Sequence, residues 1–368
     1  MKKLLYIMAI ACMVACQNDD TDFSAYTSGA ISKAHVINIT YQGNSVTVTG
    51  DNKGYVSTAG ADVTVNAMGN DSLLLVLSGS TTDGSLLIFR EKKYGIKLNG
   101  VSIHNSDGPA INNQCSKALY LNIADGTVNT LTDGTAYDEK VNYQQKGALF
   151  SEGQILISGS GTLQVTGNCK NAIASDDYII IDDDPTITAQ SSTGHGIKVN
   201  DGIWINGGIL DINVTANAAR GIKSDTEVVI TNGDITINTT GDCIYDETEA
   251  DYSSAACIKC ENAFTMSGGK LTMTSSGDGG KGVNCADVIT LTGGSLSAIT
   301  TGGNENGKPK AVKGDKGIIL SGGSFHAKVK KSWACDNGTD SEIASEHVTV
   351  MGTPSEANIT KQEVKVIF

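Results

Sequence analysis

Hydrophobic residues along this chain fall into columns that recur about every 24 residues. The stretches GIKVNDGIWINGGILDINV, from Gly196, and GIKSDTEVVITNGDITINT, from Gly221, show the repeat most clearly. With the first glycine as position zero, equivalent starts occur at Ala148, Ala172, Gly196, Gly221, Cys257, Gly282, Ala311 and Ala334. Such a period is typical of a solenoid, because each repeat has an apolar face that only its neighbours can cover.

Within each repeat the pattern predicts three short strands. Position one is always apolar, and positions seven and nine alternate with an outward residue, as in Ile203, Trp204 and Ile205. A glycine-rich turn and a third strand follow, the latter with Leu210 and Ile212 pointing inward. Three strands per turn predict an all-β parallel β-helix whose coils stack about 4.8 Å apart. A propeller blade needs about 40 residues, and an antiparallel sandwich keeps no such columns.

The two ends of the chain depart from the regular repeat. Residues 34–129 are rich in strands but less regular, and we interpret them as the first turns and cap of a single domain spanning 34–368. Residues 1–16, MKKLLYIMAIACMVAC, have the layout of an export signal. MVAC resembles a lipobox, which predicts lipidation at Cys16, although a plain signal peptide is the alternative. Residues 17–33 read as a linker, whose first residues resemble the acidic tag of surface lipoproteins. We therefore expect an outer-membrane lipoprotein exposed at the cell surface, with the lipid as its only membrane contact.

Composition narrows the possible partners. A net charge of −13 and a pI near 4.8 argue against nucleic acid, because phosphate binding needs a basic surface. Seven cysteines follow Cys16, an odd number that excludes complete pairing within a monomer, the state we expect. Cys257 and Cys260 have CxxC spacing, but position three of the repeat places Cys260 and Cys285 in the core of adjacent coils. Buried thiols are therefore favoured over zinc ligands.

One stretch carries a family resemblance. SIHNSDGPAI and NIADGTVNTLTDG, followed by KGALFSEGQILISGSGTLQVTGN, resemble a family of secreted carbohydrate-binding β-helix proteins related in fold to pectate lyases. The resemblance covers residues 36–338. It implies a right-handed parallel β-helix, bound calcium ions and affinity for plant-type polysaccharide such as cellulose or polygalacturonate, without demonstrated catalysis. The calcium ligands of the family have no motif that transfers residue by residue.

Outward positions of the first strand carry basic side chains. Position two holds Lys198, Lys223, Lys259 and Lys313, and the residues just before position zero include His195, Arg220, Lys281 and Lys310. The coil spacing is close to the length of one sugar residue, so an acidic polysaccharide could meet a cation at nearly every step. The alternative is that the acidic residues at position four, Asp176, Asp225, Glu261 and Asp315, neutralise the lysines in surface ion pairs of little energy.

Three insertions, at about 132–146, 243–254 and 302–310, all precede position zero, so we expect them at one edge of the first strand column. The second contains a dense set of carboxylates that suits calcium, with Asp278 as a possible ligand from the next coil. The predicted metal ligands are Asp242, Asp246, Glu247, Asp251 and Asp278. A solvated acidic loop is the alternative.

Trp204 lies at an outward position and could stack against a sugar ring, or it could simply cover Ile180 and Val229 on the adjacent coils. These features favour a lipoprotein that binds an acidic or plant-type polysaccharide in a calcium-dependent way. One alternative is a calcium-dependent polysaccharide lyase with Lys281, Lys223 or Arg220 as its base, because cationic neighbours lower a base's pKa. The other is a passive surface adhesin.

Overall fold

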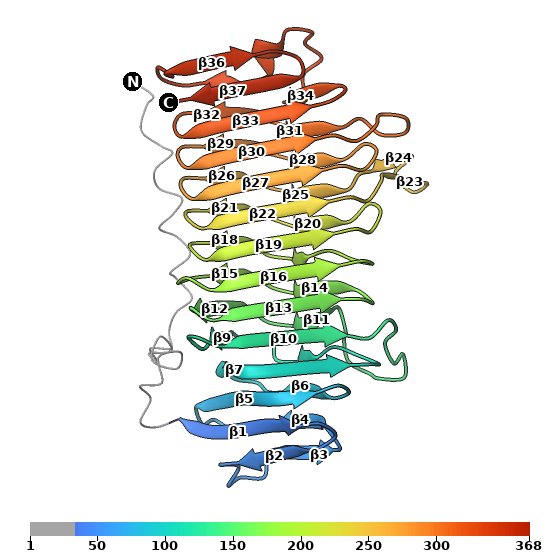
Figure 1. Cartoon of the computed structure of the whole chain (residues 1–368), viewed down its shortest axis with the longest axis vertical. Helices are drawn as coiled ribbons and strands as arrows, with labels where there is room; N and C mark the ends of the chain where they lie inside the picture. Colours follow the sequence, from blue (N-terminus) through green and yellow to red (C-terminus); the bar gives the residue numbers. More distant parts are fainter. Residues whose placement is uncertain (1–33) are drawn as a thin grey trace.

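Coil after coil, the chain forms the three short strands that its columns predict, and the coils stack into a right-handed parallel β-helix of about 11 turns (Figure 1). The computed structural model describes residues 34–368. Cys16, the predicted signal peptide and the linker lie outside the described residues, and the domain boundaries stay a prediction. Within residues 34–368 there is no helix long and apolar enough to cross a membrane.

The first strand of each coil belongs to a 12-stranded sheet, parallel throughout except for the antiparallel β3–β4 pair at its start. Its strands are β3 Val56–Ala59, β4 Asp62–Asn66, β6 Ser85–Phe89, β8 Ile111–Asn113, β11 Gly147–Ser151, β14 Asn171–Ser175, β17 Ile197–Val199, β20 Arg220–Ser224, β25 Ala256–Cys260, β28 Lys281–Cys285, β31 Lys310–Gly314 and β34 Trp333–Asp336. Neighbouring repeats pair in register, so equivalent residues form rows along the axis.

The second and third strands of the coils belong to one 23-stranded sheet. The second strands are β9 Leu119–Ile123, β12 Ile155–Gly159, β15 Ile179–Ile181, β18 Ile203–Ile205, β21 Val228–Ile230, β26 Phe264–Met266, β29 Val288–Leu291, β32 Gly317–Leu320 and β35 Thr349–Val350. The third strands are β10 Val128–Asp133, β13 Thr162–Gly167, β16 Thr186–Ser191, β19 Ile209–Val214, β22 Asp234–Thr239, β27 Lys270–Ser275, β30 Ser295–Thr300 and β33 Ser324–Val329.

Irregular pairing covers both ends of the solenoid. At the N-terminal end the long strands β1 His35–Gln42, β5 Leu73–Thr81 and β7 Tyr94–Asn105 stack in parallel, and β2 Val46–Thr49 lies antiparallel to β1. At the other end β36 Glu356–Ile359 and β37 Glu363–Ile367 form an antiparallel pair on β33, near the short 3-10 turn η1 Ala344–His347. Such pairing protects the end coils from adding further strands.

The core is a column of apolar side chains inside the coils, as the alternation predicts. Ile222, Ile258 and Val283 at position one are fully buried. Cys260 and Cys285 lie beside each other on the adjacent strands β25 and β28 and are also fully buried, which confirms the prediction from the repeat register. All seven cysteines of the described residues are free.

The connections between strands form two contrasting edges in Figure 1. Glycine-rich turns between second and third strands form the left edge, where stacking brings backbones very close. Gly269, for example, has φ +74°, and a Cβ there would lie 2.7 Å from the carbonyl carbon of Asn232. The three insertions all leave third strands at the right edge, which confirms the prediction that they share one edge. The second contains a small hairpin, β23 Ile244–Asp246 and β24 Asp251–Ser253.

Candidate functional site

Two rows of side chains on the 12-stranded sheet bring most of the predicted basic residues together. The row of outward residues, here called the lysine row, is Lys198, Lys223, Lys259, Asn284 and Lys313, each beside the next on adjacent strands. The row at the starts of the strands, here called the edge row, is His195, Arg220, Ala256, Lys281 and Lys310. The two rows run along the axis beside the edge that carries the insertions.

Carboxylates neutralise most of the lysine row. Lys223 lies 3.2 Å from Asp225, Lys259 lies 2.8 Å from Glu261, and Lys313 lies 2.7 Å from Asp315. The alternative of a neutralised row is therefore correct for these three lysines. Their side chains remain partly exposed, so each ion pair contributes little to stability. Lys198 differs, because its ammonium donates to the amide oxygen of Asn200 at 3.3 Å. Asp176 pairs instead with Lys146.

The edge row contains two cations that have no carboxylate within ion-pair distance among the described residues. Arg220 donates from Nη1 to the Ala218 carbonyl and from Nη2 to the Ser253 hydroxyl at 2.9 Å, while its buried Nε has no partner in the part of the chain that the structure describes. Burial lowers the pKa of Arg220 from its usual value. Lys310 is different, since its buried ammonium lies 2.7 Å from Asp336.

Lys281 is the second of these cations. Its ammonium donates to the hydroxyl of Ser254 and has no carboxylate within ion-pair distance in residues 34–368. Burial, followed by the charges of Lys313 and Arg220, lowers the pKa of Lys281 to about 8. A half-buried ammonium held only by a hydroxyl is poorly compensated, because burying a charge costs free energy unless an opposite charge pairs with it.

His195 lies in the edge row but does not add charge at neutral pH. Its Nδ1 accepts a hydrogen bond from the Arg220 backbone N–H at 3.0 Å. Burial and the charges of Arg220, Lys223, Lys198 and Lys259 lower the pKa of His195 to about 3. The imidazole is therefore neutral at pH 7, and its role in the edge row is to fix the backbone of Arg220.

The hairpin β23–β24 supplies two contacts that sequence reasoning missed. Ser253, at its end, contacts Arg220, and the following Ser254 contacts Lys281. Ala256 follows in the same segment and lies between the two cations in the edge row. The insertion thus supplies one hydroxyl contact to each of the two cations. The sequence signal was available, since only Ala255 separates the two serines from β25, the first strand of this coil.

The acidic residues predicted to hold calcium do not gather around one point. No group of three or more His, Cys, Asp or Glu side chains in residues 34–368 is arranged to hold a metal ion. Asp246 accepts the backbone N–H of Thr248 and Asp251 accepts its neighbour Tyr252, so both stabilise turns of their own hairpin. Glu247 lies in the same exposed turn. The set Asp242, Asp246, Glu247, Asp251 and Asp278 therefore does not fit a calcium site in this structure.

Asp242 and Asp278 instead join successive corners of the solenoid. The Asp242 carboxylate accepts the Asp278 backbone N–H at 2.7 Å. The Asp278 carboxylate accepts backbone N–H groups of Glu305 and Asn306, both at 2.9 Å. Burial opposes ionisation of Asp278, but these N–H groups outweigh it and hold its pKa below the usual value. In this structure the two carboxylates therefore accept backbone N–H groups that link successive corners of the solenoid.

Trp204 lies on a different face from the basic rows, in the second strand column. It stands between Ile180 and Val229 on adjacent coils, and its ring meets that of Tyr178 edge to face, with centroids 5.7 Å apart. The side chain is half-buried. These contacts match the covering role that the sequence left open, and they separate Trp204 from the lysine row and the edge row.

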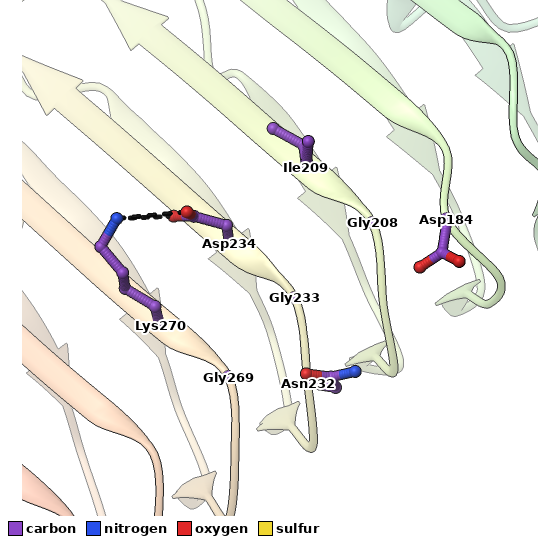
Figure 2. Close-up of a pocket in the computed structure, with 8 residues that line it drawn as sticks. All are labelled: Asp184, Gly208, Ile209, Asn232, Gly233, Asp234, Gly269 and Lys270. Carbon is purple, nitrogen blue, oxygen red and sulfur yellow. Dashed lines mark hydrogen bonds and ion pairs between the residues drawn. The ribbon is translucent and has the colours of Figure 1, made fainter.

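A cavity of about 520 Å³ lies at the glycine-rich edge (Figure 2). Its lining includes Asp184, Asn232, the exposed Ile209 and the ion pair of Lys270 with Asp234 at 3.1 Å. Figure 2 shows this pair joined across two coils, so the lysine is already neutralised. The cavity belongs to the turns after the second strands, whereas the unpaired cations belong to the first strands.

The fold and the surface described above define a parallel β-helix protein with a row of cations over its first strands. Comparison with known proteins gives the family. A family model of carbohydrate-binding domain-containing proteins matches residues 59–225 and 211–307, more than half of the chain. The chain therefore belongs to this family, which confirms the resemblance noted from its motifs.

Two relatives agree with that assignment. A carbohydrate-binding domain-containing protein of Acetivibrio thermocellus is 27% identical over 132 residues, 35% of this chain and 45% of the relative, so the match spans under half of that protein. A solved structure described as a polysaccharide lyase-like protein from C. thermocellum, in a gadolinium derivative, superposes with a TM-score of 0.56 at 26% identity. That similarity covers 69% of this chain and 96% of the solved one.

Proposed function

We propose that this protein binds an acidic polysaccharide along the lysine row and the edge row of its 12-stranded sheet. The observation that carries the proposal is the pair Arg220 and Lys281, two half-buried cations without a carboxylate partner among residues 34–368. They stand out on a chain of net charge −13. A bound carboxylate or sulfate would supply the opposite charge that the chain leaves out.

The remaining cations of the two rows extend this surface along the axis. Within the described part of the chain, Lys198 donates to an amide oxygen and to no carboxylate, and the side chains of Lys223, Lys259 and Lys313 are partly exposed. Parallel coils place these groups at regular steps, which suits a polymer with a regular repeat better than a compact ligand. The family membership and the polysaccharide lyase-like relative support a carbohydrate as the ligand.

The direct test is retention of the purified protein on immobilised polygalacturonate and on cellulose. We expect retention on the acidic polymer that weakens with salt, because screening reduces interactions between charges at a surface. Lys281→Gln should lose most of the retention, whereas Lys270→Gln, at the glycine-rich edge, should not. Absence of retention on acidic polymers at low salt would rule out this function.

A second candidate function is a polysaccharide lyase, and the pKa of Lys281 favours it. With a pKa of about 8, a useful fraction of this amine is neutral at mildly alkaline pH and can act as a base. In elimination the base removes the proton beside the carboxylate, a double bond forms, and the glycosidic oxygen leaves with a proton. Ultraviolet absorbance of unsaturated products during incubation with polygalacturonate would demonstrate this reaction, and its loss in Lys281→Gln would assign the base.

Calcium dependence remains a prediction of the family resemblance. Since the carboxylates selected from the sequence do not gather in this structure, the proposed recognition uses the cations of the chain itself. Melting curves with calcium and with a chelator test the prediction. A melting temperature that rises with calcium would indicate a site built from other oxygen atoms, and the same temperature in both conditions would argue against a structural ion.

We also propose that the protein is displayed as a lipoprotein. The MVAC motif ending at Cys16 and the residues that follow it support export, lipidation and an outer-membrane location at the cell surface. Labelling with a fatty acid in the wild-type chain and in Cys16→Ser tests the anchor, and protease accessibility on whole cells tests surface display. Gel filtration of the chain without its leader tests the predicted monomer.

A further inference from the structure

The two unpaired cations of the edge row have a defined spacing. Arg220 pairs with Ala256 on the next strand, and Ala256 pairs with Lys281 on the strand after that. Neighbouring parallel strands lie about 4.8 Å apart, so the Arg220 and Lys281 backbones are about 9.6 Å apart along the axis. The intervening position is the small, neutral, buried Ala256. Over three successive coils the edge row therefore presents a cation, a neutral side chain and a second cation.

Each coil step is close to the length of one sugar residue in an extended chain. A polysaccharide lying along the edge row would thus place successive sugar residues over Arg220, Ala256 and Lys281. An anionic group above Ala256 would find no unpaired cation in this row. The nearest lysine of the same coil, Lys259, is already bound to Glu261 at 2.8 Å.

Resting on the proposed function, we propose that Arg220 and Lys281 act together as a clamp that takes anionic groups from the first and third residues of a trisaccharide segment. The middle residue is bound without a charged contact. The substrate class is therefore a polysaccharide that presents anions on alternate residues toward the protein. Chains with a neutral sugar between two uronic acids fall in this class, as do fully charged chains whose side groups alternate in direction.

The hairpin makes the clamp more than a coincidence of register. Ser253 holds Arg220 at one end of the three-coil segment and Ser254 holds Lys281 at the other. Both serines belong to the insertion of the coil that contributes Ala256. Hydroxyl groups can orient both cations without neutralising them, so each keeps its charge for an anion. A carboxylate at either serine position would remove this property.

The test uses galacturonate oligomers of two and three residues and calorimetric titration of the full mature chain. We expect the trimer to bind at least about tenfold more tightly than the dimer, since a second charge-assisted contact is gained. A trimer methyl-esterified on its middle residue should bind within about threefold of the free trimer, and one esterified on an end residue should bind like the dimer. Equal affinity of dimer and trimer, or equal loss from middle and end esters, would overturn the clamp.

Variants assign the two ends. Lys281→Gln and Arg220→Gln should each reduce trimer affinity to that of the dimer, and Lys270→Gln is the matched control at the other edge. If Arg220→Gln does not fold, Lys281→Gln and the ester series still decide. Ala256→Lys should make the middle ester weaken binding, because it adds a cation at the neutral step. Failure of every oligomer and of the polymer to bind defeats the proposed function, whereas binding without the length and ester pattern defeats only the clamp.

Discussion

Raising the pH should release an acidic polysaccharide through deprotonation of Lys281. In the free protein the pKa of Lys281 is about 8, set by burial and then by the charges of Lys313 and Arg220. A bound anion favours the ammonium form and moves this pKa back toward its ordinary value of about 10.4. Binding therefore takes up a proton wherever free Lys281 is neutral, and the affinity must fall as pH rises through about 8.

The size of the effect follows from the protonated fraction. With a pKa of 8, about nine-tenths of Lys281 carries its proton at pH 7 and about one-tenth at pH 9. The association constant should thus fall about tenfold, which is about 1.4 kcal/mol. The other groups that face Lys281 do not produce this change. The guanidinium of Arg220 stays protonated, as arginine does in proteins, and burial with the Asp278 contact raises the pKa of the Cys243 thiol.

The assay is titration of the trimer at several pH values across this window, where the uronate carboxylates are fully ionised. Lys281→Arg provides the control, because a guanidinium stays protonated throughout and can still reach an anion. We expect binding by Lys281→Arg that varies less than about twofold between pH 7 and pH 9. The reasoning is refuted if the arginine variant shows the same fall as the wild type. A lyase would behave in the opposite way, since neutral Lys281 is the active form and the rate would increase with pH.

Three further predictions concern stability. Lys281→Met should abolish binding and raise the free energy of unfolding at pH 7 by about 1–3 kcal/mol in denaturant titrations, because it removes a buried charge. The unfolded lysine keeps its proton up to about pH 10.4, so this gain in stability should shrink between pH 8 and pH 10.4. A gain that stays constant over this range would argue against a buried charge at Lys281. Gly269→Ala should lower the free energy of unfolding by about 2 kcal/mol or more, since its Cβ would clash with the backbone of Asn232 on the adjacent coil. Gly54→Ala is the control, because Gly54 also has positive φ but nothing lies within 4 Å of its added Cβ, and it should cost about 1 kcal/mol. Equal losses would mean that the close stacking of coils is not the cause. Cys260→Ser and Cys285→Ser should each place a hydroxyl in the core, which should lower the free energy of unfolding by about 1–3 kcal/mol and with it the melting temperature. An unchanged melting temperature would contradict the burial of these two side chains.

The sequence by itself determined the fold because the parallel β-helix is periodic. A coil of about 24 residues with apolar residues at positions one, seven and nine leaves one way to bury all of them at once. The same register placed Lys198, Lys223 and Lys259 in one row, and placed Cys260 beside Cys285. It also placed the three insertions at a common edge, since all of them join a third strand to the next first strand.

Only the tertiary structure decided which charged groups are free to act. Pairing depends on side-chain direction and on contacts between coils, which residue spacing does not encode. Lys310 forms an ion pair with Asp336 on the next strand, whereas Lys281 donates to the Ser254 hydroxyl and meets no carboxylate within residues 34–368. Asp278 was equally ambiguous, because its spacing suited calcium but backbone N–H groups from a later insertion occupy its oxygens. Periodicity fixes where a backbone runs, but the free energy of a charge depends on every atom within a few ångströms of it, and folding brings those atoms together.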